Sequence, residues 1–76
     1  MKKAIEAVES QLAGTCVGIL QVGDSEYAAI VRCGVNEWRI VDVNNGAVHK
    51  QHRTSSQSVA ERWFLSYVQA RMLLWL

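Results

Sequence analysis

The tripeptide Asn44-Asn45-Gly46 restricts the fold of this chain more than any other local feature. Asn-Gly accepts positive φ at both central positions of a type I′ turn, and such a turn joins two neighbouring antiparallel strands. The flanking segments Glu37–Val43 and Ala47–Arg53 both have the length of a strand. The sequence therefore predicts a tight hairpin over residues 37–53, whose second, more polar strand lies at an edge of the sheet.

Two further strands are predicted before this hairpin. Thr15–Val22 is rich in β-branched residues, and Tyr27–Cys33 is a second apolar run. Residues 23–26 and 34–36 have the composition of turns. Because these connections are short, consecutive strands should pair with one another and form a four-stranded antiparallel meander.

A helix is predicted at each end of the chain. In residues 2–13 apolar side chains recur at three- and four-residue steps, and Gly14 is placed where a left-handed C-cap is needed. The second helix should start near Ser55, because residues 54–57 and 58–61 both fit a capping box. Its predicted apolar stripe contains Val59, Trp63, Tyr67 and Ala70, joined by Ala60, Phe64 and Val68.

Together these elements predict one small α+β domain over residues 1–76, with the order α-β-β-β-β-α. We expect the N- and C-terminal helices to pack on one face of the meander sheet. Trp38 and Trp63 are the predicted aromatic partners in the core, because each can bury a large apolar area.

Composition bounds the function. The chain has 76 residues, a net charge of +1 and 50% hydrophobic residues, which is typical of a globular domain and gives no preference for a polyanionic partner. The longest purely apolar run, Met72–Leu76, is far shorter than the roughly 20 residues of a membrane span. Glu6 and Glu9 interrupt any apolar signal-peptide core near the N-terminus. We therefore expect a cytoplasmic protein without a membrane partner.

Cys16 and Cys33 admit two interpretations. If the first hairpin loop is centred on residues 24–25, the two cysteines lie opposite each other and a disulfide is geometrically conceivable. Free cysteine is common in the interior of cytosolic proteins, so we expect two reduced, packed thiols.

Metal and catalytic motifs are missing from the sequence. His49 and His52 stand at spacings from the cysteines and from each other that match no zinc knuckle, and on a regular strand they point to opposite faces. There is no Ser-His-Asp order, Gly-rich phosphate loop or pair of acids. We expect a protein that is not an enzyme and that has no metal, cofactor or small-molecule ligand.

A basic strip on the last predicted strand contains His49, Lys50, His52 and Arg53. With the rings of Tyr27 and Trp38 on the sheet, such a strip could contact nucleic acid or an acidic partner. The element order also resembles that of a double-stranded-RNA-binding domain, but residues 54–60 lack the lysine cluster with which that family starts its last helix. Nucleic-acid binding is therefore the alternative function, and a solvated edge strand is the simpler interpretation.

The end of the last helix is the predicted protein interface, with residues Arg71, Met72, Leu73, Leu74, Trp75 and Leu76. Apolar side chains run continuously round the helix here, so only one stripe can face the sheet. Each large apolar side chain left in water would forgo about 1.5–3 kcal/mol, and a contiguous exposed patch usually marks an interface. A second copy of the chain is the favoured cover; a different protein and the first helix of the same chain are the alternatives.

In size and layout the chain is similar to short phage and mobile-element proteins, through its strand at 37–43, its hairpin and its Ser/Thr-capped helix. This resemblance implies a small inhibitor that docks on a host complex, as anti-CRISPR proteins do. The sequence thus predicts a small non-catalytic protein-binding module that is homodimeric through its C-terminal helix, with a host protein as a further partner.

Overall fold

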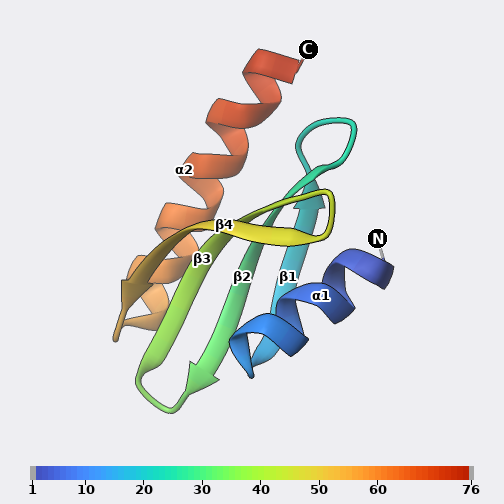
Figure 1. Ribbon diagram of the computed structural model, residues 1–76. Coiled ribbons are helices and arrows are strands. Elements are labelled where there is room, and N and C mark those ends of the chain that lie inside the picture. Colours follow the sequence, from blue (N-terminus) through green and yellow to red (C-terminus); the bar gives the residue numbers. More distant parts are fainter. Residues whose placement is uncertain (1, 76) are drawn as a thin grey trace.

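The computed structural model in Figure 1 describes residues 2–75 and, within them, all side chains except those of Lys50 and residues 73–75. Six elements follow one another: α1 (Lys2–Leu12), β1 (Thr15–Gln21), β2 (Glu26–Gly34), β3 (Glu37–Asn44), β4 (Ala47–Thr54) and α2 (Gln57–Trp75). The strands form one antiparallel sheet in the order β1-β2-β3-β4. The predicted α+β class and meander are confirmed, and each strand begins and ends within one residue of its predicted bounds.

The predicted hairpin turn is also confirmed. Asn44 pairs with Ala47, and the two residues between them have positive φ angles of 52° for Asn45 and 80° for Gly46. These are the angles that a type I′ turn requires at its two central positions. The turn therefore sets the β3–β4 pairing and leaves β4 at the edge of the sheet.

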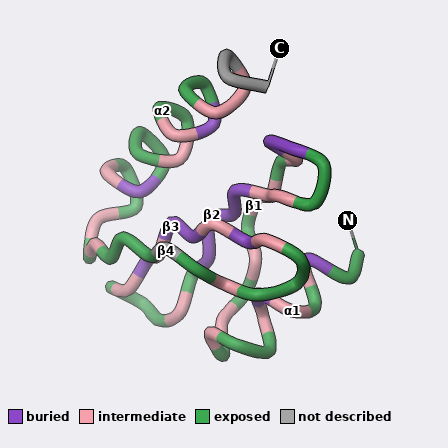
Figure 2. Tube along the Cα trace, turned by 45° about the horizontal axis from the view of Figure 1, so that its top comes forward, coloured by how far each residue is buried: buried purple, intermediate pink, exposed green. Residues whose placement is uncertain are grey.

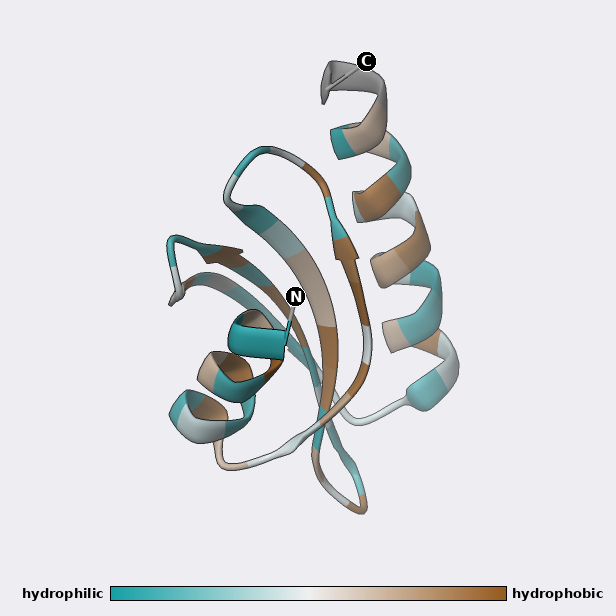
Figure 3. Cartoon of the chain, turned by 90° about the vertical axis from the view of Figure 1, so that its right-hand side faces the viewer, coloured by the Kyte–Doolittle hydropathy of each residue, from teal (hydrophilic) through white to brown (hydrophobic). Residues whose placement is uncertain are grey.

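The two helices lie on opposite faces of the sheet, so the prediction that both pack on one face is wrong (Figure 3). Val8 of α1 packs in one cluster with Val41, whereas Ala60 of α2 packs in another with the neighbouring residue, Ile40. Successive side chains of a strand point to opposite faces. Because β2 and β3 carry apolar residues at both sets of positions, each face of the sheet needs its own helix.

Side chains of α1 bind backbone groups of both edge strands. Glu9 Oε2 accepts a hydrogen bond of 2.9 Å from the N–H of Cys16 in β1. Gln11 donates to the carbonyl of Gly46 at 2.9 Å and accepts from the N–H of Val48 at 3.0 Å. The start of β4 thus curves over the helix in Figure 1, and α1 holds the two edges of the sheet together.

The register that would place Cys16 opposite Cys33 is not formed. The Gln21–Tyr27 pair centres the first loop on residue 24, and a β-bulge directly after Cys16 shifts the register by one further residue. Cys16 therefore lies opposite Val31. Both cysteines are free in the described part of the chain.

The left-handed residue after α1 is Ala13, with φ 53°, and not the predicted Gly14. Gly14 is required for a different reason. A Cβ at this position would lie 2.8 Å from the carbonyl oxygen of Arg32 and 2.9 Å from a methyl carbon of Val31. The chain can therefore pass close to β2 only where the side chain is a hydrogen atom.

The helix α2 begins two residues after the predicted start at Ser55. Ser56 is its N-cap, because its hydroxyl accepts a hydrogen bond of 3.3 Å from the N–H of Val59. The hydroxyl of Thr54 accepts from the N–H of Ser56 at 3.2 Å and so fixes the turn that precedes the cap. No helix among residues 2–75 is long and apolar enough to span a membrane.

The side of α2 that faces the sheet differs in part from the predicted stripe (Figure 2). Ala60, Phe64 and Val68 pack on the sheet as predicted. Trp63 does not belong to the core: it is 43% exposed and meets His52 edge-on, with ring centroids 6.0 Å apart. Ala60 therefore lies at the centre of the contact with the sheet, and Trp63 lies on the flank of the helix beside His52 of β4.

Candidate protein-binding surface

The predicted interface at the end of α2 is described only in part. Arg71 forms an ion pair with Glu26, and Met72 packs beside Val22 and Ala28. Both residues therefore lie against the sheet of their own chain. The side chains of Leu73, Leu74 and Trp75, and all of Leu76, lie outside the described residues, so their role in an interface stays a prediction.

The predicted basic strip is divided between the two faces of the sheet. His52 lies opposite Ile40, on the face that α2 covers, whereas Arg53 lies opposite Arg39, on the face of α1. The His49 side chain is exposed, and that of Lys50 is outside the described residues. The two aromatic rings of the predicted nucleic-acid surface are also taken up, because Trp38 is buried and Tyr27 packs against the core on the α1 side.

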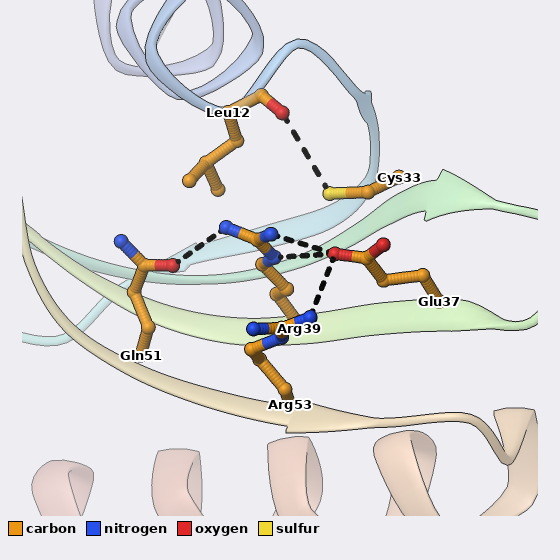
Figure 4. Close-up of polar contacts among 6 residues, drawn as sticks. All are labelled: Leu12, Cys33, Glu37, Arg39, Gln51 and Arg53. Carbon is orange, nitrogen blue, oxygen red and sulfur yellow. Dashed lines mark hydrogen bonds and ion pairs between the residues drawn. The ribbon is translucent and has the colours of Figure 1, made fainter.

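The cations on the α1 side are held in a network on β3 and β4 (Figure 4). Arg39 donates to Glu37 Oε2 through Nε at 3.0 Å and Nη2 at 2.6 Å, and to Gln51 Oε1 through Nη1 at 3.0 Å. Arg53 Nη2 lies 3.8 Å from the same Glu37 oxygen. The hydrogen bonds from Arg39 lower the pKa of the Glu37 carboxyl below its usual range. This network joins two strands, and the Glu37 carboxylate offsets one of the two positive charges that a polyanion would otherwise meet.

A second polar cluster lies between α2 and the sheet. Burial, together with the nearby Asp42 carboxylate, raises the pKa of the Tyr67 hydroxyl. Tyr67 therefore stays protonated at neutral pH, where it is a hydrogen-bond donor and not a nucleophile. The adjacent Arg71–Glu26 ion pair ties α2 to the start of β2.

The Cys16 thiol does not have the environment of a reactive thiol. Burial raises the pKa of the Cys16 thiol, and the nearby Glu9 carboxylate raises it further. The Sγ atom of Cys16 donates to the carbonyl of Gly18 at 3.4 Å, and that of Cys33 donates to the carbonyl of Leu12 at 3.8 Å. Among the described residues there is also no group of three or more His, Cys, Asp or Glu side chains that could hold a metal ion.

An apolar groove runs between β1 and α2, and we call it the β1–α2 groove. Its volume is about 340 Å³, and its lining residues are Val17, Gly18, Ile30, Trp38, Gln57, Glu61, Phe64 and Leu65. Two of the apolar side chains on its rim, Val17 and Leu65, are 57% and 56% exposed. A ligand in this groove would meet mostly hydrocarbon, with the polar groups of Gln57 and Glu61 at one side.

The groove exists because α2 lies over β2, β3 and β4, while β1 extends beyond it. Leu20 of β1 pairs with Ala28 and is 46% exposed on the same face as the groove. Figure 3 views the sheet from its β1 edge and shows the hydrophobic colour of this strand. Val17, Leu20 and Leu65 together thus leave an apolar surface along this edge.

The sequence prediction missed this surface. Leu65 is a large apolar residue outside the apolar stripe of α2. Its position was the sequence signal that could have identified the surface. Val17 was hidden for another reason: it lies in the β-bulge, which the alternation of a regular strand does not show.

Comparison with known proteins found no matching protein family, no similar curated protein and no similar solved structure. The geometry of its own surface is therefore the basis on which a function can be assigned to this chain.

Proposed function

We propose that this chain is a small, non-catalytic protein-binding module that binds its partner through the β1–α2 groove and the apolar residues beside it. The observation that carries the proposal is the pair of exposed large apolar side chains, Val17 and Leu65, on the two rims of an apolar groove. Removing such side chains from water is favourable by about 25 cal/mol per Å² of apolar area, from which the entropic cost of association is subtracted. A contiguous apolar surface of this kind is typical of protein interfaces.

The chemistry of the other candidate sites supports a role without catalysis. The Tyr67 hydroxyl and the Cys16 thiol both have raised pKa values, so neither is activated as a nucleophile at neutral pH. The carboxylate of Glu37 is bound by Arg39 and is not free to act as a general base.

We propose a second copy of the chain as the first partner. A more specific version of the proposal adds a host protein as a further partner, which the chain would bind in the manner of an anti-CRISPR inhibitor. The interface predicted from the sequence at residues 71–76 stays a separate proposal for the same binding.

A photo-reactive amino acid at position 65 tests the proposal. In the purified protein and in a bacterial lysate, the probe at Leu65 should cross-link to a protein, which mass spectrometry identifies as a second copy or a different chain. Val35 supplies the matched control, because it is an even more exposed apolar residue, at 79%, and lies between β2 and β3, away from the groove. If the probe at position 65 cross-links no more protein than the probe at position 35, the proposal is wrong.

Nucleic-acid binding through residues 49–53 remains the competing proposal. Counterion release makes such binding weaken steeply with salt. A gel-shift titration at micromolar protein separates the two proposals, because a nucleic-acid-binding domain would give a salt-sensitive complex and a protein-binding module would give none.

A further inference from the structure

We infer that the β1 edge is where a second copy of this chain binds, by antiparallel pairing of β1 with β1 of the other copy. The two four-stranded sheets then form one continuous sheet. The inference rests on the proposed protein-binding function and goes further, because it assigns the strand through which the second copy binds and the direction of pairing.

The two edges of the sheet differ in charge. Exposed edge strands in soluble proteins are usually protected by charged side chains, which oppose pairing with another chain. The β4 edge has such protection in His49, Lys50, His52 and Arg53. The β1 edge, Thr15–Gln21, contains no charged residue. Pairing of β4 with its own copy would bring cations together, whereas pairing of β1 with its own copy opposes no charges within the strand.

Some backbone groups of β1 point away from β2 and toward solvent. The N–H of Val22 donates to the carbonyl of Glu26 at 2.9 Å, which closes the first loop. In an antiparallel ladder the hydrogen-bonded pairs alternate along the strand. Val22 and Glu26 therefore form a hydrogen-bonded pair, and the next such pair back along the strand is Leu20–Ala28. Ile19 and Gln21 belong to the intervening pairs, so their N–H and C=O groups point away from β2. These groups are placed to pair with an added strand.

The helix α1 limits the part of the β1 edge that a second copy can use. The N–H of Cys16 is bound by Glu9 from this helix, so the start of β1 is already covered by the same chain. The edge that a second copy can use therefore runs from Val17 to Gln21. This stretch contains both Ile19 and Gln21 with their outward backbone groups.

The exposed apolar side chains of Leu20 and Leu65 both lie on the α2 side of the β1 edge. A two-fold axis perpendicular to the sheet makes the added strand antiparallel and keeps both α2 helices on the same face. The apolar residues Leu20 and Leu65 of each copy then meet above the paired β1 strands, and the two β1–α2 grooves join. One contact thus satisfies the backbone groups of β1 and covers the apolar rim of the groove.

The test compares the molar mass of wild type, Leu20→Lys and Val35→Lys by light scattering over a range of protein concentrations. Leu20→Lys places a charge on the exposed α2 side of β1, and two such charges meet across the axis of the proposed dimer. We expect a dimer for wild type and Val35→Lys, and a dissociation constant at least about tenfold higher for Leu20→Lys, because like charges oppose each other at the interface. Val35→Lys makes the same chemical change at a residue outside β1.

Amide hydrogen exchange supplies an independent reading of the same strand. In the wild-type protein the N–H groups of Ile19 and Gln21 should be protected at concentrations where the dimer forms, and should exchange faster on dilution. Circular dichroism shows whether Leu20→Lys keeps the fold. If it unfolds, Val17→Lys replaces it, because this side chain is 57% exposed.

Two results would overturn the pairing of β1 with β1. One is a wild type that stays monomeric at all concentrations. The other is a dimer that Leu20→Lys leaves intact and in which the amides of Ile19 and Gln21 exchange freely. In either case the photo-reactive probe at Leu65 decides separately about the proposed function: cross-linking to a protein supports a binding module with another interface, and its failure refutes both proposals.

Discussion

At the scale of single residues, Ala13 and Gly14 divide between them two demands that one glycine often meets. Ala13 takes the left-handed conformation, with φ 53°, and Gly14 allows the close approach to the carbonyl of Arg32. A left-handed backbone costs an L-residue with a Cβ about 1–2 kcal/mol. Glycine avoids this cost, although it loses more chain entropy on folding.

We therefore predict that Ala13→Gly raises the free energy of unfolding by about 0.5–1 kcal/mol. Gly14→Ala should lower it by about 1–3 kcal/mol, because its methyl group would overlap the backbone carbonyl of Arg32 and the buried side chain of Val31. Urea denaturation of the two variants measures both changes. Equal effects of the same sign at the two positions would contradict this division of roles.

Glu37 gives a prediction for pH. The hydrogen bonds from Arg39 lower the pKa of its carboxyl in the folded protein below the ordinary value of 4.5. The unfolded chain therefore binds the proton first as the pH falls, so the stabilising contribution is complete above pH 4.5 and is lost as the pH falls through the lowered pKa. Glu37→Gln keeps a hydrogen-bond acceptor for Arg39 and removes the titration.

The difference in the free energy of unfolding between wild type and Glu37→Gln should accordingly be larger at neutral pH than at about pH 3. Urea denaturation at the two pH values measures it. A difference that does not change with pH would show that the ion pair with Arg39 contributes nothing to stability.

At the scale of elements, the start of α2 depends on one hydroxyl. Ser56 accepts from the N–H of Val59, whereas Ser55 is exposed. Ser56→Ala should lower the free energy of unfolding by about 1 kcal/mol, the usual contribution of an N-cap. Ser55→Ala is the matched control and should change stability little. The assignment of the cap is wrong if the two variants are equally stable in thermal denaturation.

The elements themselves could be predicted because their signals are local. The Asn45-Gly46 turn, the change of period after α1 and the short connections together specify four strands in a meander. A helix start is harder to predict in a run such as residues 54–58, where several hydroxyl residues can serve as the cap. The sequence pattern therefore predicts the first residue of α2 only to within two positions.

The faces of the sheet could not be predicted in this way, because short loops restrict which strands pair and not the side on which a helix docks. Residues such as Val41 and Ile40 show that both faces are apolar, and this was the available indication of two helical layers. The register at Cys16 and the exposure of Val17 depend on a β-bulge, which depends on contacts with other elements. The candidate surface was missed for the same reason.

At the scale of the whole molecule, we propose the β1 edge as the surface for a partner, and the sequence predicts a further interface at residues 71–76. The sequence predicts that Leu74→Asp weakens self-association, because a charge would replace one apolar side chain in the run of residues 72–76. Light scattering measures the molar mass of this variant beside that of wild type. If wild type is a dimer and Leu74→Asp is equally dimeric, residues 71–76 are not the interface.

The hydrogen bonds of Gln11 with Gly46 and Val48 have a consequence for folding kinetics. They join residues 35 and 37 positions apart in the chain, so α1 can complete its docking only after the β3–β4 hairpin exists. We expect these contacts to form after the rate-limiting step, so that Gln11→Ala accelerates unfolding and leaves the folding rate unchanged in stopped-flow measurements. A slower folding rate would place α1 in the folding nucleus. During synthesis on the ribosome, α1 emerges before the four strands and would then be among the last of these elements to dock.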